Sequence, residues 1–492
     1  MPPTGDPAPA LRTDPALGAW PGLARDSFAS LDGRAPDPAI AAAARVLRGE
    51  LGVPTDRPVV MTGHQAELWH GGIFAKYAAA GAAARAAGGA AAWVVADQDQ
   101  NDHASIRLPV RTPAGHLAAR VHRFGSLSGA VTGRREPMEP VRVPDALRSA
   151  LPGDTLRARV GVIEQTLAAH RHAPSAAEQI ARTLADLLLP HVDPAPTVFA
   201  TRLGGSSLFG ALAAALADDP VAAARAYNTA AADEPSAGVT PLHIEADAPA
   251  HTEVPAWVID AAGHRRRALA RDLAPDALGP RESLAPRALL MTLMLRVAAC
   301  DLFVHGTGGA AYDRVTERWA GAWLGARLAP AALATADVRL RLETVGAEAG
   351  APPVDRAVWR AHHGRHDPGV IGDAGAAAEK RGLVRSVAAE PRGSAGRAAA
   401  FARMHEWLGA YRERAADELA WLDAEVERAR SAERARRVLA ERAWAFALAD
   451  PSDLRALTAA AAAAAAGWAG ETPPAANGPA ARAEPCGCAG AG

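Results

Sequence analysis

The chain has 492 residues and a formal net charge of −1 at neutral pH, so it is long enough to bury a large core and to carry subsidiary parts. Its arginines are dispersed, which argues against a dedicated nucleic-acid-binding protein. The N-terminus lacks a basic segment followed by an apolar run, and no stretch reaches about 18 strongly apolar residues in succession. We therefore expect a cytoplasmic protein with small-molecule substrates, no nucleic-acid partner and no membrane association.

Both ends of the chain are rich in Pro, Ala and Gly, a composition typical of disordered segments. We expect disorder over residues 1–20 and over residues 467–492. The second segment contains Cys486 and Cys488, which could form a redox pair or could belong to a plain appendage. Cys300 lies within an apolar run and is predicted to be a core residue.

The stretch VVMTGHQAELWHGGIFAKY, residues 59–77, begins as an apolar strand, breaks at a glycine and continues as a helix. A second apolar strand, AAAWVVADQD, follows it at residues 90–99. Strand, helix and strand within about 40 residues predict a βαβ unit, with a right-handed crossover and a parallel sheet. Lys76 is one of two lysines, beside Lys380, in a chain otherwise rich in arginine, which makes its presence informative.

Two further strand-to-helix junctions share this pattern, at residues 197–216 and at residues 300–324. Since glycine and polar residues follow all of these strands, we predict an α/β fold with a doubly wound sheet and a ligand crevice along its carboxyl edge. This core would cover residues 21–340. Alternating apolar residues broken by Pro and Gly predict an inserted β subdomain at about residues 236–270.

Beyond a connecting region at residues 341–396, apolar residues recur at steps of three and four between Met404 and Ala429. This spacing predicts one long amphipathic helix over residues 397–448, with the seam of a coiled coil. Such a helix would extend about 75 Å. We expect it to pack on the body, on a second copy of the chain, or on both.

The first junction has the character of an anion site. Gly63 would let the backbone approach a ligand closely, and the start of the following helix would present free N–H groups. His64 and His70 could flank the anion and stabilise negative charge, or they could serve only in capping and packing.

Acidic residues follow the second predicted strand. Asp97, Asp99 and Asp102 lie where a Mg²⁺ ion or an amine substrate would be held at the carboxyl end of a buried strand. The same residues could form an ordinary solvated loop.

The third junction, HGTGGAAYD, ends its strand at His305 and turns through glycines. It fits an anion or ribose site by type, or a simple tight turn. In RLGGSSLFG, Arg202, Ser206 and Ser207 could bind a ligand or cap a helix.

Metal-site patterns in the sequence are weak, and no nucleophile elbow or HExxH zinc helix is present. Two His-x-Glu pairs could form a zinc site if their strands paired: His243 with Glu245, and His251 with Glu253. A second cluster, at His362, His363 and His366, is more typical of an exposed loop.

Taken in order, the motifs VVMTGHQAELWHGG, AWVVADQD and SLAPRALLMTLMLRVAACDLFVHGTGGAAYD, with the predicted coiled coil after them, resemble the bacillithiol biosynthesis cysteine-adding enzymes, also called putative cysteine ligases or bacillithiol synthases. The resemblance runs from about residue 59 to residue 448. Residues 62–65 stand where that family has a Thr-Gly-Gln-Gln turn, residues 97–100 where it has an acidic and histidine-containing run, and residues 306–312 where it has a Gly-Gly-Pro-Gly-Glu segment.

The resemblance implies a Rossmann-like core related to class I nucleotidyl-transfer and synthetase folds, with inserted connecting regions and a coiled coil that forms a homodimer. It implies an ATP-dependent ligase that joins cysteine, or a related acid, to an amine acceptor such as glucosaminyl malate. The alternative is a non-catalytic dimeric scaffold that binds a nucleotide or metabolite.

For a ligase we expect ATP or ADP, with Mg²⁺, as the cofactor. The candidate catalytic residues are His64, Gln65, His70, Asp97 and Asp99. The candidate nucleotide-binding residues are Thr62, Gly63, His305, Gly306, Gly308, Gly309 and Tyr312.

Overall fold

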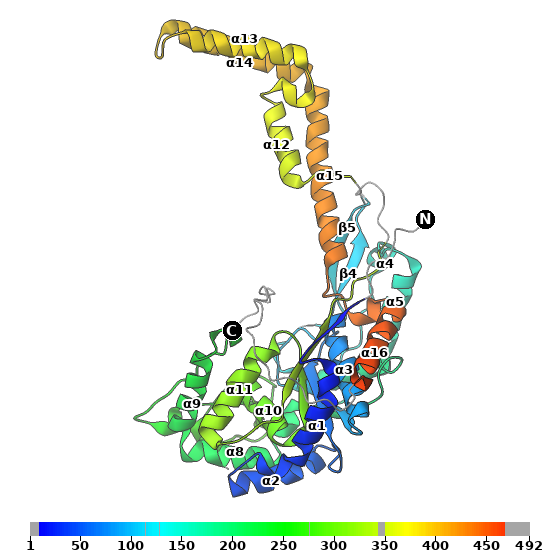
Figure 1. Cartoon of the computed structure of the whole chain (residues 1–492), viewed down its shortest axis with the longest axis vertical. Helices are drawn as coiled ribbons and strands as arrows, with labels where there is room; N and C mark the ends of the chain where they lie inside the picture. The colour runs from blue at the N-terminus through cyan, green and yellow to red at the C-terminus, as the bar shows by residue number, and fades with distance from the viewer. Residues whose placement is uncertain (1–8, 114, 127, 275, 343–349, 468–492) are drawn as a thin grey trace.

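The computed structural model describes residues 9–113, 115–126, 128–274, 276–342 and 350–467. Figure 1 shows a body built around a central sheet and a helical arm that projects from it. Within the described ranges, no single helix is long and apolar enough to cross a membrane. Two consecutive helices with a sharp bend between them, Ser207–Asp218 and Pro220–Ala232, reach that length and apolar composition only when they are taken together.

The central sheet has six strands among the described residues, in the order β1-β11-β10-β2-β3-β6. The strands from β11 to β6 run parallel, and β1 pairs antiparallel with β11 at the edge. The parallel α/β arrangement predicted from the junctions is therefore confirmed. The bounds are β1 Leu11–Asp14, β2 Val59–Gln65, β3 Ala90–Ala96, β6 Thr197–Phe199, β10 Leu302–His305 and β11 Ala331–Ala336.

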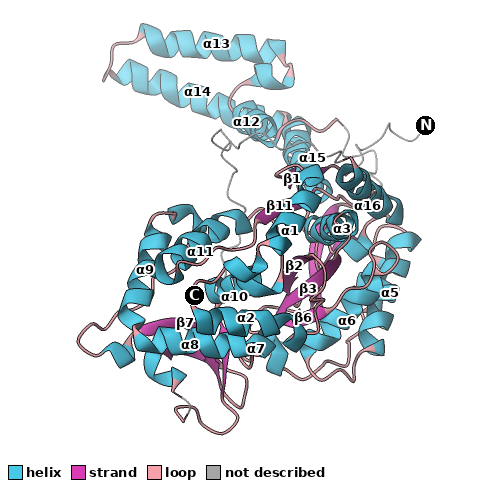
Figure 2. Ribbon diagram, turned by 60° about the horizontal axis from the view of Figure 1, so that its bottom comes forward, coloured by secondary structure: helices cyan, strands magenta, loops and turns pink. Residues whose placement is uncertain are grey.

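Helices cover both faces of this sheet (Figure 2). Val60, Val95 and Val304 pack into one core, whereas Met61 and Val94 pack into the other, because successive strand residues point to opposite faces. Burial on both faces explains why these strands read as continuous apolar runs. The first core receives α1 Trp20–Ala29, α3 Gly71–Ala86, α5 Asp154–Ala169, α6 Ala176–Leu188 and α16 Pro451–Ala466; the second receives α2 Pro38–Glu50, α8 Ser207–Asp218, α9 Pro220–Ala232, α10 Ala288–Met294 and α11 Gly309–Leu324.

Smaller elements surround the core. A hairpin of β4 Ser105–Arg111 and β5 Leu117–Arg123, which the sequence did not predict, lies near the arm (Figure 1). Short helices α4 Asp145–Ser149 and α7 Ala200–Leu203 and a π-helical turn at Leu295–Ala299 complete the body.

The antiparallel strands predicted for an inserted β subdomain are present, but the predicted bounds of about 236–270 are wrong for them. They form an antiparallel sheet in the order β8-β7-β9, with β7 Glu253–Ile259, β8 Arg265–Leu269 and β9 Ser283–Pro286. Residues 238–248 form no strand, and the backbone around Leu242 is bonded instead to the side chain of Asn228.

The prediction of disorder over residues 1–20 is wrong for the described part. Leu11–Asp14 form β1, and Trp20 is fully buried. The backbone of β1 pairs with β11, and Trp20 packs into the hydrophobic core. Amino-acid composition alone cannot predict either interaction. Residues 1–8 lie outside the described residues, as do residues 468–492 with Cys486 and Cys488. Cys300 is buried in the core, as predicted.

The single long helix predicted over residues 397–448 is wrong. The structure has α14 Ala395–Arg414 and α15 Ala416–Ala440, separated at the non-helical Ala415. The helix ends at Ala440, and the chain then enters the body, where Trp444 and Leu448 are buried. Residues 410–420 contain neither Gly nor Pro, so no sequence signal marks the break.

The connecting region at residues 341–396 contains two helices, α12 Val354–Gly364 and α13 Ala374–Ala389. In Figure 1, α13 lies against α14, and α12 lies against α15. Leu408, Leu419 and Leu422 of the predicted seam belong to one hydrophobic cluster with Ala357 and Ala361 of α12. The described part of the seam is therefore covered at least partly by the chain itself.

Candidate functional site

The sheet reverses its order at β2. From β2 the chain proceeds to β3 and β6 on one side, and later to β10 and β11 on the other. Ligands of open α/β sheets bind outside the carboxyl ends of strands at such a switch point. Because β10, β2 and β3 are neighbours, the first and third predicted motifs and the acidic run lie on one edge.

Thr62 and Gly63 have structural reasons to be where they are. The Thr62 hydroxyl donates to the carbonyl oxygen of Val304 at 2.8 Å. A Cβ at Gly63 would collide with the carbonyl oxygen of Val94 and lie 2.7 Å from its Cβ. Close packing of β2 on β3 therefore accounts for the glycine without any ligand.

His64 ends β2 beside an acid that the sequence did not single out. Its Nδ1 lies 3.3 Å from Oε1 of Glu67, within ion-pair distance but without hydrogen-bond geometry. Burial, with repulsion from Lys76 and His70, holds the pKa of His64 well below its usual value. Burial and nearby Asp102 raise the pKa of Glu67 to about 7.

His70 is the N-cap of α3, as the capping alternative foresaw. Its Nδ1 accepts a hydrogen bond from the backbone N–H of Gly72 at 3.0 Å. Burial, followed by repulsion from Arg442 and Lys76, lowers the pKa of His70 to about 4. The ring is therefore neutral near pH 7 and offers hydrogen bonding rather than positive charge.

Lys76 was not predicted as a site residue, although its rarity in this chain was the signal. It is only 3% exposed, and its Nζ donates to the carbonyl oxygen of Gly63 at 2.7 Å. Burial lowers the pKa of Lys76 to about 7. A Cβ at Gly306 would lie 3.7 Å from Cδ of Lys76, so this side chain connects the ends of β2 and β10.

The acidic run after β3 is bound within the protein. The Asp97 carboxylate accepts from the N–H of Thr201 at 2.8 Å and from its hydroxyl at 2.5 Å, and burial raises the pKa of Asp97 to about 6. Asp99 accepts from Arg265 at 2.7 Å and from Gln65 at 3.3 Å.

The two other titratable residues of this run also have protein partners. Asp102 pairs with Arg123 at 3.1 Å. His103 lies 2.8 Å from Nη1 of Arg135. The run therefore holds neighbouring loops together, and Asp99 and Asp102 are its partly exposed carboxylates.

No group of three or more His, Cys, Asp or Glu side chains within the described ranges could hold a metal ion. In the proposed zinc pairs, Glu253 is buried against Arg287 and Arg267, whereas His243 is exposed. The zinc hypothesis is therefore wrong.

The third junction forms a tight turn at the end of β10. The N–H of Gly309 donates to the carbonyl oxygen of Gly306 at 3.0 Å. A Cβ at Gly309 would lie 2.5 Å from Nδ1 of His305, so the ring of His305 requires glycine there. Its Nε2 lies 3.1 Å from Oδ1 of Asp313.

The same turn leads into α11. No described side chain caps the start of this helix at Gly308, so its first N–H groups have no side-chain partner. Tyr312 is partly buried against the second core rather than extended from the helix start.

In the RLGGSSLFG segment, capping explains the serines. Ser206 caps α8 by accepting from the N–H of Phe209 at 3.2 Å, and Ser207 bonds to Glu50. The guanidinium of Arg202 lies over the ring of Phe199, 5.2 Å from its centroid.

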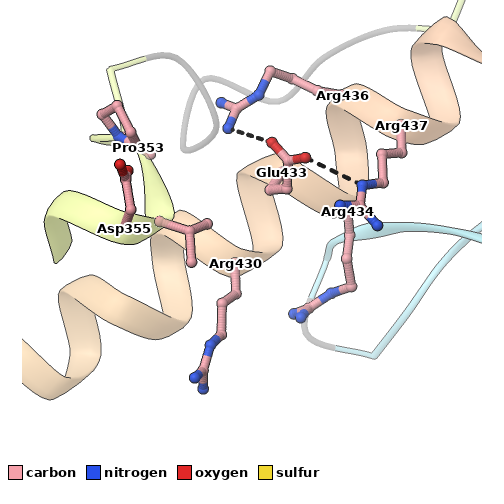
Figure 3. Close-up of a pocket in the computed structure, with 9 residues that line it drawn as sticks. Pro353, Asp355, Arg430, Glu433, Arg434, Arg436 and Arg437 are labelled. Atoms are coloured by element: carbon pink, nitrogen blue, oxygen red, sulfur yellow. Dashed lines mark hydrogen bonds and ion pairs between the residues drawn. The ribbon is translucent and has the colours of Figure 1, made fainter. Parts of the chain in front are cut away.

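A hollow of about 570 Å³ lies elsewhere, at the base of the arm (Figure 3). None of its lining residues comes from the three junctions. It is lined by Ala351, Pro353, Val354, Asp355, Arg430, Glu433, Arg434, Arg436 and Arg437. Glu433 pairs with Arg436 at 2.9 Å and with Arg437 at 3.1 Å.

At the sheet edge, several buried polar atoms have no hydrogen-bond partner among the described residues: His64 Nδ1, Asn101 Oδ1, Asp102 Oδ1 and His305 Nε2. Buried polar groups are normally satisfied, so this gathering points to the edge rather than to the hollow as the candidate site. Comparison with known proteins finds no matching family model and no matching curated protein.

Proposed function

We propose that the chain is an ATP-dependent ligase that joins a carboxylic acid to an amine, like the cysteine-adding enzymes that its motifs resemble, and that its core is Rossmann-like. The main support for this proposal is the order of the strands in the central sheet. It makes β10, β2 and β3 neighbours, with the switch between β2 and β10, where an open α/β sheet accommodates a nucleotide.

The nucleotide phosphates would lie between the end of β2 and the turn before α11. His64 has an unpartnered ring nitrogen there, and α11 begins without a side-chain cap among the described residues. Lys76 adds an amine at the base of the same edge. Uncapped N–H groups and a basic side chain are suitable donors for phosphate oxygens.

The described residues do not fit a magnesium site of their own. Asp97 is bound to Thr201, Asp99 to Arg265, and no metal-binding cluster is present within the described ranges. We therefore assign no step to a protein-held Mg²⁺ ion.

Formation of the new C–N bond releases a proton from the amine, and that proton needs an acceptor. Glu67 lies beside His64, and its pKa is raised to about 7 by burial and by nearby acids. A base is most effective when its pKa is close to the working pH. Glu67 is therefore the residue to which we assign this proton.

A non-catalytic scaffold is the second candidate, favoured by two observations. Asp97 and Asp99, the carboxylates expected to hold the amine, both have protein partners. The turn at residues 306–312 also lacks a carboxylate.

For either function we propose a homodimer through the arm, where Trp359, Phe401 and Trp421 are exposed.

Calorimetric titration with ATP and ADP, with and without Mg²⁺, tests the nucleotide site. We expect the wild type to bind and His64→Ala to bind about ten- to 150-fold more weakly, because one hydrogen bond to a charged group contributes about 1.5–3 kcal/mol. His362→Ala, on the distant α12, should bind like the wild type. Failure of the folded wild type to bind either nucleotide would contradict the proposal.

A further inference from the structure

Lys76 has a position that packing alone does not explain. It projects from α3 to the carboxyl end of β2, where its Nζ donates to the carbonyl oxygen of Gly63 at 2.7 Å. Its aliphatic part lies near Gly306 at the end of β10, where an added Cβ would be 3.7 Å from Cδ of Lys76. The amine therefore lies at the switch point of the sheet, between the two strand ends that the proposed nucleotide site uses.

This amine has no described carboxylate within ion-pair distance. An ammonium has three N–H donors, and Gly63 accepts from one. Burying a charge without a counter-ion is costly, and burial alone lowers the pKa of Lys76 to about 7. An arginine here would stay charged at all working pH values, whereas a lysine can lose its proton.

The surroundings of Lys76 contain both basic and acidic groups, and Glu67, 3.3 Å from His64, is an acid that borders the candidate site. Lys76 lies close enough to His64 of β2 and to His70 at the start of α3 to lower the pKa of both rings by charge repulsion. His305 precedes Gly306 on β10 and faces Asp313 of α11. In the segment after α15, Arg442 lowers the pKa of His70 and Glu441 raises it. Arg442 also pairs with Asp337. Each of these acids lies beside a basic group, whereas Lys76 has no carboxylate partner among the described residues, so Lys76 is the cation that an anion at the strand ends would meet.

We propose that the Lys76 ammonium is the countercharge for a phosphate-bearing ligand at the ends of β2 and β10, so that ligand binding is coupled to proton uptake by Lys76. This inference rests on the proposed nucleotide site and adds its charge and its pH dependence. An anion nearby favours the protonated amine, so the bound state holds a proton that the free protein lacks above about pH 7.

The sign of the pH dependence follows from this coupling. Below pH 7 free Lys76 is already largely protonated, and binding should change little on its account. Above pH 7 a proton must be taken up, so the affinity should fall towards a limit of about tenfold per pH unit.

The test is calorimetric titration with ATP at pH 8 in two buffers of different ionisation enthalpy, which gives the number of protons taken up. We expect the wild type to take up close to one proton. Lys76→Met should take up none, and at pH 6.5 it should bind at least tenfold more weakly. Lys76→Arg, which keeps a fixed charge, should bind without uptake, and thermal unfolding followed by circular dichroism checks that both variants fold.

The outcomes separate this inference from the proposed function. If the wild type binds ATP but Lys76→Met binds equally well, or still takes up the proton, Lys76 is not the countercharge and the nucleotide site stands. If proton uptake persists in Lys76→Arg, a histidine, Glu67 or the nucleotide carries the proton, and the inference is again wrong. If the folded wild type does not bind ATP, both proposals fail.

Discussion

Asp301→Ala is expected to lower the free energy of unfolding by about 3–5 kcal/mol. The carboxylate is fully buried just before β10. Its Oδ1 accepts from Arg34 at 2.7 Å and from Arg48 at 2.8 Å, and its Oδ2 accepts from the N–H of Val59 at 2.8 Å. Without it, two buried guanidinium groups lose their counter-ion, and such uncompensated charges are costly.

The effect should extend to the candidate site, because the bond to Val59 joins the start of β2 to the residue before β10. Urea unfolding followed by circular dichroism measures the loss. Asp32→Ala is the matched control: Asp32 is 81% exposed and pairs only with Arg45 among its described ion pairs, so a change below about 1 kcal/mol is expected. Similar small losses in both variants would contradict this assignment.

Gly63→Ala should destabilise the protein by about 1–3 kcal/mol or more, since it inserts an atom into a closely packed pair of strands. The new Cβ would collide with the carbonyl oxygen of Val94, opposite Gly63 in the register of β2 and β3. The strands must separate, which would also displace the carbonyl oxygen that holds Lys76. Chemical denaturation without any ligand measures the effect.

Gly308→Ala is the control for this substitution. A Cβ at Gly308 meets no atom within 4 Å, and its backbone has an ordinary helical conformation with φ −80°. The stability of the Gly308→Ala variant should stay close to that of the wild type. If Gly63→Ala were equally harmless, sheet packing would not be the reason for glycine at the end of β2.

The central sheet could be predicted because its signals are local. Parallel strands buried on both faces read as uninterrupted apolar runs, and glycine marks the ends of β2 and β10. The same reasoning fails for β1, whose stability comes from β11 more than 300 residues away in the sequence. Sequence-based reasoning also fails at Ala415, because no helix-breaking residue marks the end of α14.

The candidate site was predictable in its position but not in its chemistry. Parallel topology alone places the junctions on one edge. However, Asp97 is engaged by Thr201, 104 residues later, and no local pattern shows this pairing. The burial of Lys76 and the raised pKa of Glu67 likewise depend on which elements cover them. Residue type and spacing therefore predicted that the site lies at the carboxyl edge of the sheet. They did not predict which side chains at this edge already have partners within the protein.

Ligase activity is tested most directly by mass spectrometry of a mixture of the protein, ATP, Mg²⁺, cysteine and glucosaminyl malate. We expect a product in which acid and amine are joined with loss of water, formed only with ATP and strongly reduced by His64→Ala. Related acids and amines extend the same assay if cysteine is not the substrate. Bound ATP that is neither consumed nor accompanied by any joined product would contradict a ligase and favour the binding scaffold.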